Sequence, residues 1–188
     1  MLKDIILASA SPRRKELLSV ITSEFEVIPS EIEEIVPDDI DVLEQAEYLS
    51  FIKAEDVAKN NPLSVVIGAD TCVVVGNKIL GKPKDKYDAE NMLKLLSGKV
   101  HQVVTGCTVF KGNRVESFSV VTDVEFFDLS ENEIEKYINS NEPYDKAGAY
   151  AIQGKASLFV KEIKGDYFNV VGLPISQLNR VLRSFLDN

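Results

Sequence analysis

Short apolar runs alternate with longer amphipathic segments along the whole chain. The first run, residues 5–7, leads into a predicted helix in which Ser11 is placed as the cap and Pro12 suits the first position. Residues 40–59 carry apolar side chains at helical spacing, so we expect a long helix there. Residues 64–75 are almost continuously apolar, which is typical of a central buried strand.

The rest of the chain continues this alternation and predicts a mixed fold. Two long strand-like segments, residues 99–110 and 114–127, are joined by the turn Lys111-Gly112-Asn113 and predict a hairpin. The other expected elements are a strand over residues 25–29, helices over residues 87–96 and 130–139, a strand over residues 158–163 and a last helix that begins at Leu173-Pro174. Since no linker or internal repeat interrupts the pattern, we expect one mixed α/β domain over residues 1–188 rather than a repeated parallel array.

The composition fits an ordinary soluble globular protein and narrows its partners. Of the 188 residues, 45% are hydrophobic and 27% are charged, and the net charge of −9 argues against nucleic-acid binding. Cys72 and Cys107 lie in apolar runs, so we expect reduced, buried thiols. No apolar run reaches transmembrane length, and the N-terminus lacks the layout of a signal peptide. We therefore expect a cytoplasmic protein without a membrane partner.

A cluster of cations stands where a helix normally favours anions. Arg13, Arg14 and Lys15 fall in the first turn of the predicted helix, where the free N–H groups and the helix dipole make positive charge unfavourable. The cluster is either a solvated surface turn or a binding site for a small polyanion. The neighbouring hydroxyls of Ser9 and Ser11 and the forked geometry of arginine favour a phosphate ligand.

Asp70 interrupts the apolar run of residues 64–75, and an unpaired carboxylate is costly to bury there. Asp70 could form a structural ion pair with Lys53 or Lys82. It could instead accept backbone N–H bonds at a bend made by Gly68. In an enzyme active site it could hold a divalent cation or orient a water molecule. The residue alone leaves these interpretations open.

Three further residues are candidates, each with an ordinary alternative. Glu34, beside Glu33, follows a predicted strand and could add a second carboxylate to a metal site, although a charged loop is usually solvated. Lys53 occupies an apolar position of its helix, so it either extends to the surface or serves a function. Lys82 lies in a rigid Gly-Lys-Pro loop suited to reaching a phosphate, but lysines are common in loops.

The motifs of several other nucleotide-binding and hydrolytic classes are missing from the sequence. It contains neither a GxxxxGK[ST] loop nor a GxGxxG loop. The only histidine, His101, alternates within a predicted strand, and we expect it to form a structural hydrogen bond rather than to act as a catalytic base. The sequence has no nucleophile motif for a triad, and its two cysteines lack the spacing of a zinc site.

Six segments together resemble the Maf family of nucleoside-triphosphate pyrophosphatases. They are LASASPRRKELL at residues 7–18, GADT at 68–71, GKP at 81–83, LSGKVHQVVTG at 96–106, EPYDKAGAYAIQG at 142–154 and NVVGLP at 169–174. In the order and spacing of the family, these segments cover essentially the whole chain. The resemblance implies an elongated, inosine-triphosphate-pyrophosphatase-like α/β fold with a long mixed sheet and two lobes that share one cleft. It also implies a homodimer.

The resemblance further implies an activity and a site. Members of the family hydrolyse a nucleoside triphosphate to the monophosphate and pyrophosphate with a divalent cation, Mg²⁺ or Mn²⁺. The branch similar to this chain prefers dTTP and UTP as a house-cleaning enzyme, and its specificity positions fall on Arg13, Thr71 and Gln153. The catalytic aspartate proposed for the family falls on Asp70, and the other cleft residues fall on Ser9, Glu34, Lys53 and Lys82.

These residues suggest two separate roles, one in binding the triphosphate and one in binding the cation and the water. We expect Arg13, helped by Arg14 and by the two lysines, to gather the triphosphate, and Asp70 with Glu34 to hold the cation and to position or deprotonate a water. Cys72 departs from the aliphatic residue that is usual in the family, which should not affect the chemistry. Two rivals remain: a purine-type triphosphate pyrophosphatase on the same fold, and a non-catalytic nucleotide- or protein-binding regulator of septum formation.

Overall fold

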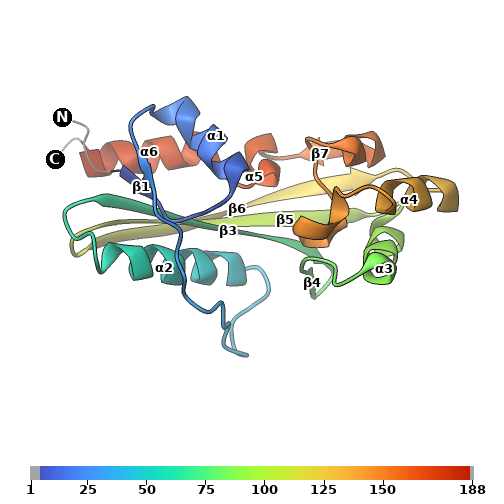
Figure 1. Ribbon diagram of the computed structural model, residues 1–188, viewed down its shortest axis with the longest axis horizontal. Helices are drawn as coiled ribbons and strands as arrows, with labels where there is room; N and C mark the ends of the chain where they lie inside the picture. The colour runs from blue at the N-terminus through green and yellow to red at the C-terminus, as the bar shows by residue number, and fades with distance from the viewer. Residues whose placement is uncertain (1–4, 187–188) are drawn as a thin grey trace. The chain divides into compact units, whose positions relative to one another are not determined.

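The computed structural model describes residues 5–186, which form helices and strands in alternation (Figure 1). The first half contains β1 (Ile5–Leu7), α1 (Pro12–Ile21), β2 (Glu26–Val27), α2 (Gln45–Ala58), β3 (Val65–Val75), β4 (Lys78–Leu80) and α3 (Lys86–Leu96). The second half contains β5 (Val100–Lys111), β6 (Arg114–Phe126), α4 (Glu131–Ile138), η1 (Pro143–Asp145), η2 (Ala147–Ala149), η3 (Lys155–Phe159), β7 (Val160–Lys164), α5 (Tyr167–Val171) and α6 (Ile175–Leu186), where η marks a 3₁₀ helix.

The seven strands form one mixed sheet. Its strand order is β2-β1-β3-β5-β6-β7, and β4 pairs with β3. Strand β1 pairs in parallel with both β2 and β3, whereas β3–β4 and β6–β7 are antiparallel. The neighbouring strands β5 and β6 are joined by the turn at Gly112-Asn113, which confirms the predicted hairpin. The mixed α/β fold class predicted from the sequence is therefore confirmed.

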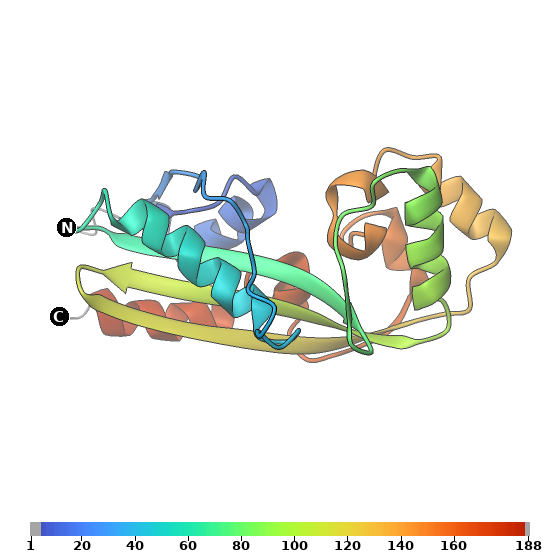
Figure 2. The ribbon, with the colours of Figure 1, turned by 90° about the horizontal axis from the view of Figure 1, so that it is seen from below.

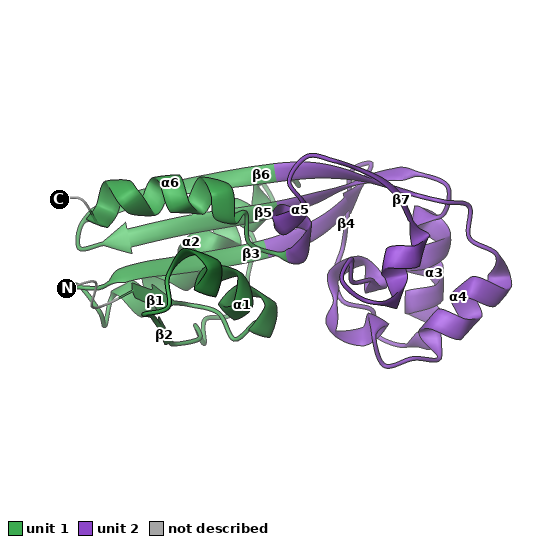
Figure 3. Cartoon of the chain, turned by 90° about the horizontal axis from the view of Figure 1, so that it is seen from above, with its two compact units in different colours: residues 1–70, 105–120, 172–188 green, residues 71–104, 121–171 purple. Residues whose placement is uncertain are grey.

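Contacts within the chain define two compact units (Figure 3). The first unit takes in residues 1–70, 105–120 and 172–188, and the second takes in residues 71–104 and 121–171. Strands β3, β5 and β6 each contribute residues to both units.

In the first unit, helices cover both faces of the sheet. Helices α1 and α6 contact each other on one face, and α2 lies along the opposite face (Figure 1 and Figure 2). The close approach of α2 depends on two glycines. A Cβ atom at Gly68 would collide with the carbonyl oxygen of Ser50, and a Cβ atom at Gly106 would collide with the backbone of Ala46. The helix can therefore lie directly on β3 and β5.

The second unit has a core of its own, in which α3 and α4 pack beside the 3₁₀ segments. Leu93 and Leu96 of α3 are fully buried with Phe126 of β6. Helix α4 begins with the predicted capping box: Ser130 accepts from the N–H of Glu133, whose carboxylate accepts from the N–H of Ser130. Both orphan donors at this helix start are therefore satisfied.

The predicted helix over residues 40–59 begins too early. In the structure α2 starts at Gln45, because the carboxylate of Asp41 accepts the backbone N–H of Leu43 at 2.9 Å. Such a local side-chain hydrogen bond offers the backbone an alternative to the helix. The strand predicted over residues 158–163 begins at Val160, after the 3₁₀ helix η3.

The cysteines and the apolar character of the helices bear on expectations from the composition. Cys72 and Cys107 are buried thiols, as predicted, and burial raises the pKa of Cys107 to about 12. Within residues 5–186, no helix combines the length and the apolar character that a membrane span requires.

His101 is a buried core residue of β5, in agreement with its expected structural role. Its side chain is 1% exposed, its Nε2 atom lies 2.8 Å from the hydroxyl of Tyr150, and its ring packs edge-on against Phe126. Burial lowers the pKa of His101 from 6.5 to about 4. The imidazole is therefore neutral at pH 7 in the folded protein.

This buried imidazole should make stability depend on pH. Below pH 6.5 the unfolded chain binds a proton at His101 that the folded protein does not bind until about pH 4. Between pH 7 and pH 5, we expect this residue to account for a loss of about 2 kcal/mol. Urea unfolding at both pH values should show that loss in the wild type but not in His101→Gln, whose amide can still meet the Tyr150 hydroxyl. Equal losses of unfolding free energy in the two proteins would show that His101 does not cause the pH dependence.

Candidate active site

The start of α1 is built as the sequence predicts. Ser11 has extended backbone angles, with φ −65° and ψ 118°, and its Oγ atom accepts the N–H of Arg14 at 3.5 Å. Pro12 occupies the first helical position, and the first turn carries no acidic residue. The free N–H groups of this ten-residue helix are consequently accompanied only by positive charge.

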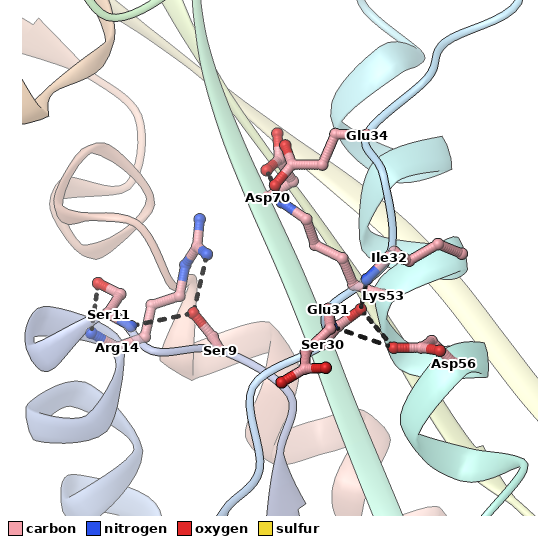
Figure 4. Close-up of polar contacts among 10 residues, drawn as sticks. All are labelled: Ser9, Ser11, Arg14, Ser30, Glu31, Ile32, Glu34, Lys53, Asp56 and Asp70. Atoms are coloured by element: carbon pink, nitrogen blue, oxygen red, sulfur yellow. Dashed lines mark hydrogen bonds and ion pairs between the residues drawn. The ribbon is translucent and has the colours of Figure 1, made fainter.

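Arg14 is held in a fixed position beside this helix start. Its Nε atom donates to the carbonyl oxygen of Gly172 at 2.9 Å, and its Nη1 atom donates to Ser9 Oγ at 3.2 Å (Figure 4). Desolvation lowers the pKa of the Arg14 guanidinium, and the charges of Asp70 and Glu34 act in the opposite direction. Arg13 and Arg14 are both half-buried, and these hydrogen bonds hold Arg14 in place.

Lys53, Asp70 and Glu34 come together at the other side of β3 (Figure 4). The ammonium of Lys53 lies 2.6 Å from Asp70 Oδ1 and 2.8 Å from Glu34 Oε1. Only 13% of the Lys53 side chain and 15% of the Asp70 side chain are exposed, against 54% for Glu34. Of the interpretations open for Asp70, the ion pair with Lys53 is therefore formed, and it includes a second carboxylate.

Gly68 makes this ion pair geometrically possible. Ser50, which a side chain at Gly68 would strike, lies one helical turn before Lys53, and Gly68 itself lies two residues before Asp70 on the strand. Residues i and i+2 of a strand point to the same face, and residues i and i+3 share one side of a helix. Contact at Gly68 therefore brings Lys53 directly over Asp70.

The loop that carries Glu34 is tied to the same helix. Asp56 Oδ2 accepts the hydroxyl of Ser30 at 2.7 Å and the backbone N–H of Glu31 at 3.3 Å (Figure 4). Ser30 Oγ in turn accepts the N–H of Ile32 at 3.2 Å. Asp56 stands three residues after Lys53 on α2, so the anchor and the ion pair lie on one side of the helix.

Ser30 and Asp56 are positioning residues that the sequence analysis does not identify. The sequence offers one indication of Asp56: it is a second charged residue at helical spacing from Lys53, on a helix face expected to be apolar. A spacing of this kind shows that two side chains share a helix face. It does not show that a loop distant in sequence lies on that face.

The remaining candidates belong to the second unit. Thr71 follows Asp70 on β3 and is half-buried, Lys82 is exposed in the loop after β4, and Gln153 is exposed between η2 and η3. Ser9, Arg13, Arg14, Glu34, Lys53 and Asp70 all belong to the first unit. The assignment of Thr71, Lys82 and Gln153 to a substrate stays a prediction.

The two carboxylates are suitable ligands for a hard divalent cation. Their oxygens converge on one cationic group, and Mg²⁺ is usually bound by one or two carboxylates together with water and substrate phosphates. Among residues 5–186 no group of three or more His, Cys, Asp or Glu side chains is arranged to hold a metal. Asp70 and Glu34 are two carboxylates that could bind such a cation, and this assignment stays a prediction.

A family model described as Maf-like protein matches residues 4–185. The chain belongs to the Maf-like protein family. A dTTP/UTP pyrophosphatase of Bacillus pumilus (strain SAFR-032) is 51% identical over 184 residues, which covers 98% of this Maf-like chain and 97% of the relative. A dTTP/UTP pyrophosphatase of Alkaliphilus oremlandii (strain OhILAs) is 54% identical over 190 residues, with coverage of 99% and 98%.

Solved structures of low sequence identity share the fold of this Maf-like protein. The Ham1 protein of Staphylococcus aureus matches with a TM-score of 0.59 and 18% identity, covering 97% of this chain and 99% of that chain. A HAM1 protein from Coxiella burnetii matches with a TM-score of 0.55 and 16% identity, covering 96% and 98%. These likenesses confirm the inosine-triphosphate-pyrophosphatase-like fold class.

Lys53 on α2 and Lys59, the residue that follows the helix, allow a direct measurement of the Lys53 ion pair. Lys53→Met should lower the free energy of unfolding by about 2–4 kcal/mol, because it leaves the largely buried Asp70 carboxylate without its closest cation. Lys59→Met removes only an exposed pair with Glu55 and should cost less than about 0.5 kcal/mol. Urea unfolding of both variants measures the difference. Equal effects would show that the Lys53 pair is energetically an ordinary surface contact.

Proposed function

We propose that this protein is a nucleoside triphosphate pyrophosphatase that hydrolyses dTTP and UTP to the nucleoside monophosphate and pyrophosphate. Relatives about half identical to it over nearly their whole length bear the name dTTP/UTP pyrophosphatase. The observation that carries the proposal in the structure is the Lys53 ammonium held between Asp70 and Glu34, with the hydrogen-bonded Arg14 guanidinium on the other side of β3. Two carboxylates beside fixed cations suit phosphoryl chemistry.

The triphosphate would be gathered at the start of α1. Arg13 offers a forked guanidinium for phosphate oxygens, and the N–H groups of the first turn add further donors. Arg14 is already fixed by Ser9 and by the carbonyl of Gly172, so its charge needs no reorganisation when an anion arrives. Lys82 is proposed as an additional phosphate ligand.

A divalent cation, Mg²⁺ or Mn²⁺, is proposed as the cofactor, with Asp70 and Glu34 as its protein ligands. When bound, such an ion supplies charge that polarises phosphate oxygens and makes water more acidic. Lys53 donates a hydrogen bond to Asp70 Oδ1 and fixes the direction of this carboxylate. Asp70 can then accept a proton from the water that attacks the α-phosphorus, and the arginines and lysines stabilise the charge of the departing pyrophosphate.

Recognition of the base is assigned to Arg13, Thr71 and Gln153. The hydroxyl of threonine and the amide of glutamine can both donate and accept, which suits the carbonyl and N–H edge of a pyrimidine. We further propose a house-cleaning role on modified pyrimidine triphosphates, a cytoplasmic location and a homodimer that binds no nucleic acid. The net charge of −9 supports the absence of a nucleic-acid partner.

Asp70→Asn tests the catalytic assignment. The amide keeps the size of the side chain but can neither take up the proton nor bind the cation strongly, so pyrophosphate release should fall by at least ~10²-fold. Glu55→Gln is the matched control, because it makes the same acid-to-amide change on the surface of α2 beside Lys59. Circular dichroism and thermal unfolding check that both variants fold. Near-normal turnover of Asp70→Asn would remove Asp70 from the mechanism.

A panel of triphosphates tests the substrate class. We expect dTTP, UTP and base-modified pyrimidine triphosphates to be hydrolysed well ahead of ATP and GTP with Mg²⁺ or Mn²⁺, and no activity with a chelator in excess. Pyrophosphate release measures each case. Preference for purines would favour the purine-type enzyme. Tight nucleotide binding without pyrophosphate release under any metal condition would favour the non-catalytic regulator.

A further inference from the structure

Glu142 is a half-buried acid in the second unit that joins three parts of the chain. Its Oε2 atom accepts the backbone N–H of Lys155 at 2.9 Å, and its Oε1 atom accepts the N–H of Ala156 at 3.3 Å. Oε1 also accepts the hydroxyl of Tyr137, on α4, at 3.1 Å. A single carboxylate therefore fixes the first two residues of η3 relative to α4.

The residue just before this anchored stretch is Gly154, which has no side chain. The carboxylate of Glu142 occupies the space that a Cβ atom at Gly154 would take, so a side chain there would displace it. The N–H of Gly154 donates to the carbonyl oxygen of Ala151 at 3.0 Å and closes a turn. Gln153 lies inside this turn, with its backbone held on both sides and its side chain exposed.

The same segment supports the loop that contains Lys82. The N–H of Gly148 donates to the carbonyl oxygen of Gly81 at 3.1 Å, and Gly148 packs against Val73 with a positive φ of 67°. The next residue, Ala149, is fully buried and has a φ of 60°, a conformation that residues other than glycine seldom adopt. Such conformations persist where the surroundings determine the backbone, and they cluster at functional sites.

The segment is also tied back to Glu142 through its main chain. Lys146 Nζ donates to the carbonyl oxygen of Glu142 at 3.0 Å and pairs with Asp145. These hydrogen bonds together hold the segment of residues 142–156 in place. The segment exposes the Gln153 side chain, and its bond to Gly81 holds the backbone next to Lys82.

We propose that Glu142 is a positioning residue for recognition of the pyrimidine base, acting through Gln153. This inference rests on the proposed function, in which Gln153 reads the base edge. An amide can distinguish bases only if its donor and acceptor are presented in a fixed direction, and a displacement of about 1 Å is enough to lose such an interaction. By fixing the backbone of residues 154–156, Glu142 sets where the Gln153 side chain begins and reduces the ordering needed when the base binds.

The decisive measurement compares substrates with and without a base. Glu142→Ala should lower kcat/KM for dTTP by at least ~10-fold and leave kcat/KM for abasic 2-deoxyribose 5′-triphosphate nearly unchanged. Gln153→Ala should show the same selective loss. Since both act on one interaction, the double variant Glu142→Ala/Gln153→Ala should lose no more selectivity than Gln153→Ala alone.

Two controls separate positioning from stability. Glu133→Ala breaks the capping box of α4 in the same unit, where the Glu133 carboxylate accepts from Ser130, so it should lower Tm without changing the ratio of kcat/KM between dTTP and the abasic substrate. Glu142→Gln keeps one carbonyl oxygen that can accept an N–H, so it should retain an intermediate ratio even if Glu142→Ala folds poorly. Amide hydrogen exchange at Lys155 and Ala156 should accelerate in both Glu142 variants.

These experiments separate a failure of the Glu142 positioning role from a failure of the proposed function. The ratio of kcat/KM for dTTP to kcat/KM for the abasic substrate could stay unchanged in the Glu142 variants and fall in Gln153→Ala. That result would overturn the positioning role and leave the proposed function intact. Independent, multiplicative losses from Glu142→Ala and Gln153→Ala would overturn it as well. A wild type that releases no pyrophosphate, or a Gln153→Ala variant with normal selectivity, would overturn the proposed base recognition and this inference together.

Discussion

The contact between α2 and β3 at Gly68 is the constraint on which the first unit depends. Without a side chain at this position, the helix backbone reaches the strand, and the ammonium of Lys53 reaches Asp70 at 2.6 Å. A carboxylate in a continuous apolar strand would otherwise be costly to bury. The packing contact at Gly68 therefore lets Lys53 offset the cost of burying the Asp70 carboxylate and fixes the direction of that carboxylate. Glu34 shares the same ammonium, and its loop is held on α2 by Asp56.

Both units hold their exposed candidate residues by a similar device. Each of the two loops is anchored by a carboxylate that accepts backbone N–H groups close to the candidate. Asp56 accepts from Glu31 ahead of Glu34, and Glu142 accepts from the two residues that follow Gly154. Charge-assisted bonds of this kind are stronger than neutral ones, and they fix the backbone rather than the functional side chain. In both loops the anchoring carboxylate bonds to the main chain near the candidate residue and not to its side chain.

Local features of the chain were predicted well where they depend on neighbours in sequence. The cap at Ser11, the capping box that starts at Ser130 and the buried strand before Asp70 all have causes within a few residues. The start of α2 was predicted five residues too early because Asp41 forms a local hydrogen bond that competes with helix formation. Residues 143–159 contain three short 3₁₀ helices, which the sequence did not predict. They are held by hydrogen bonds to Glu142 and Gly81, and such contacts leave no periodic pattern in the sequence.

The sequence by itself determined that Asp70 needs a partner, because its apolar neighbours fix it in a buried strand and burial of a lone charge is unfavourable. It also determined the family, through segments distributed along the whole chain. Only the tertiary structure decided that the partner is Lys53, that Glu34 shares it, and that Arg14 bonds to Ser9 and Gly172. Periodicity places side chains on a face of one element. The distance between two elements depends on which residues pack between them, and here it is set by the missing side chain of Gly68.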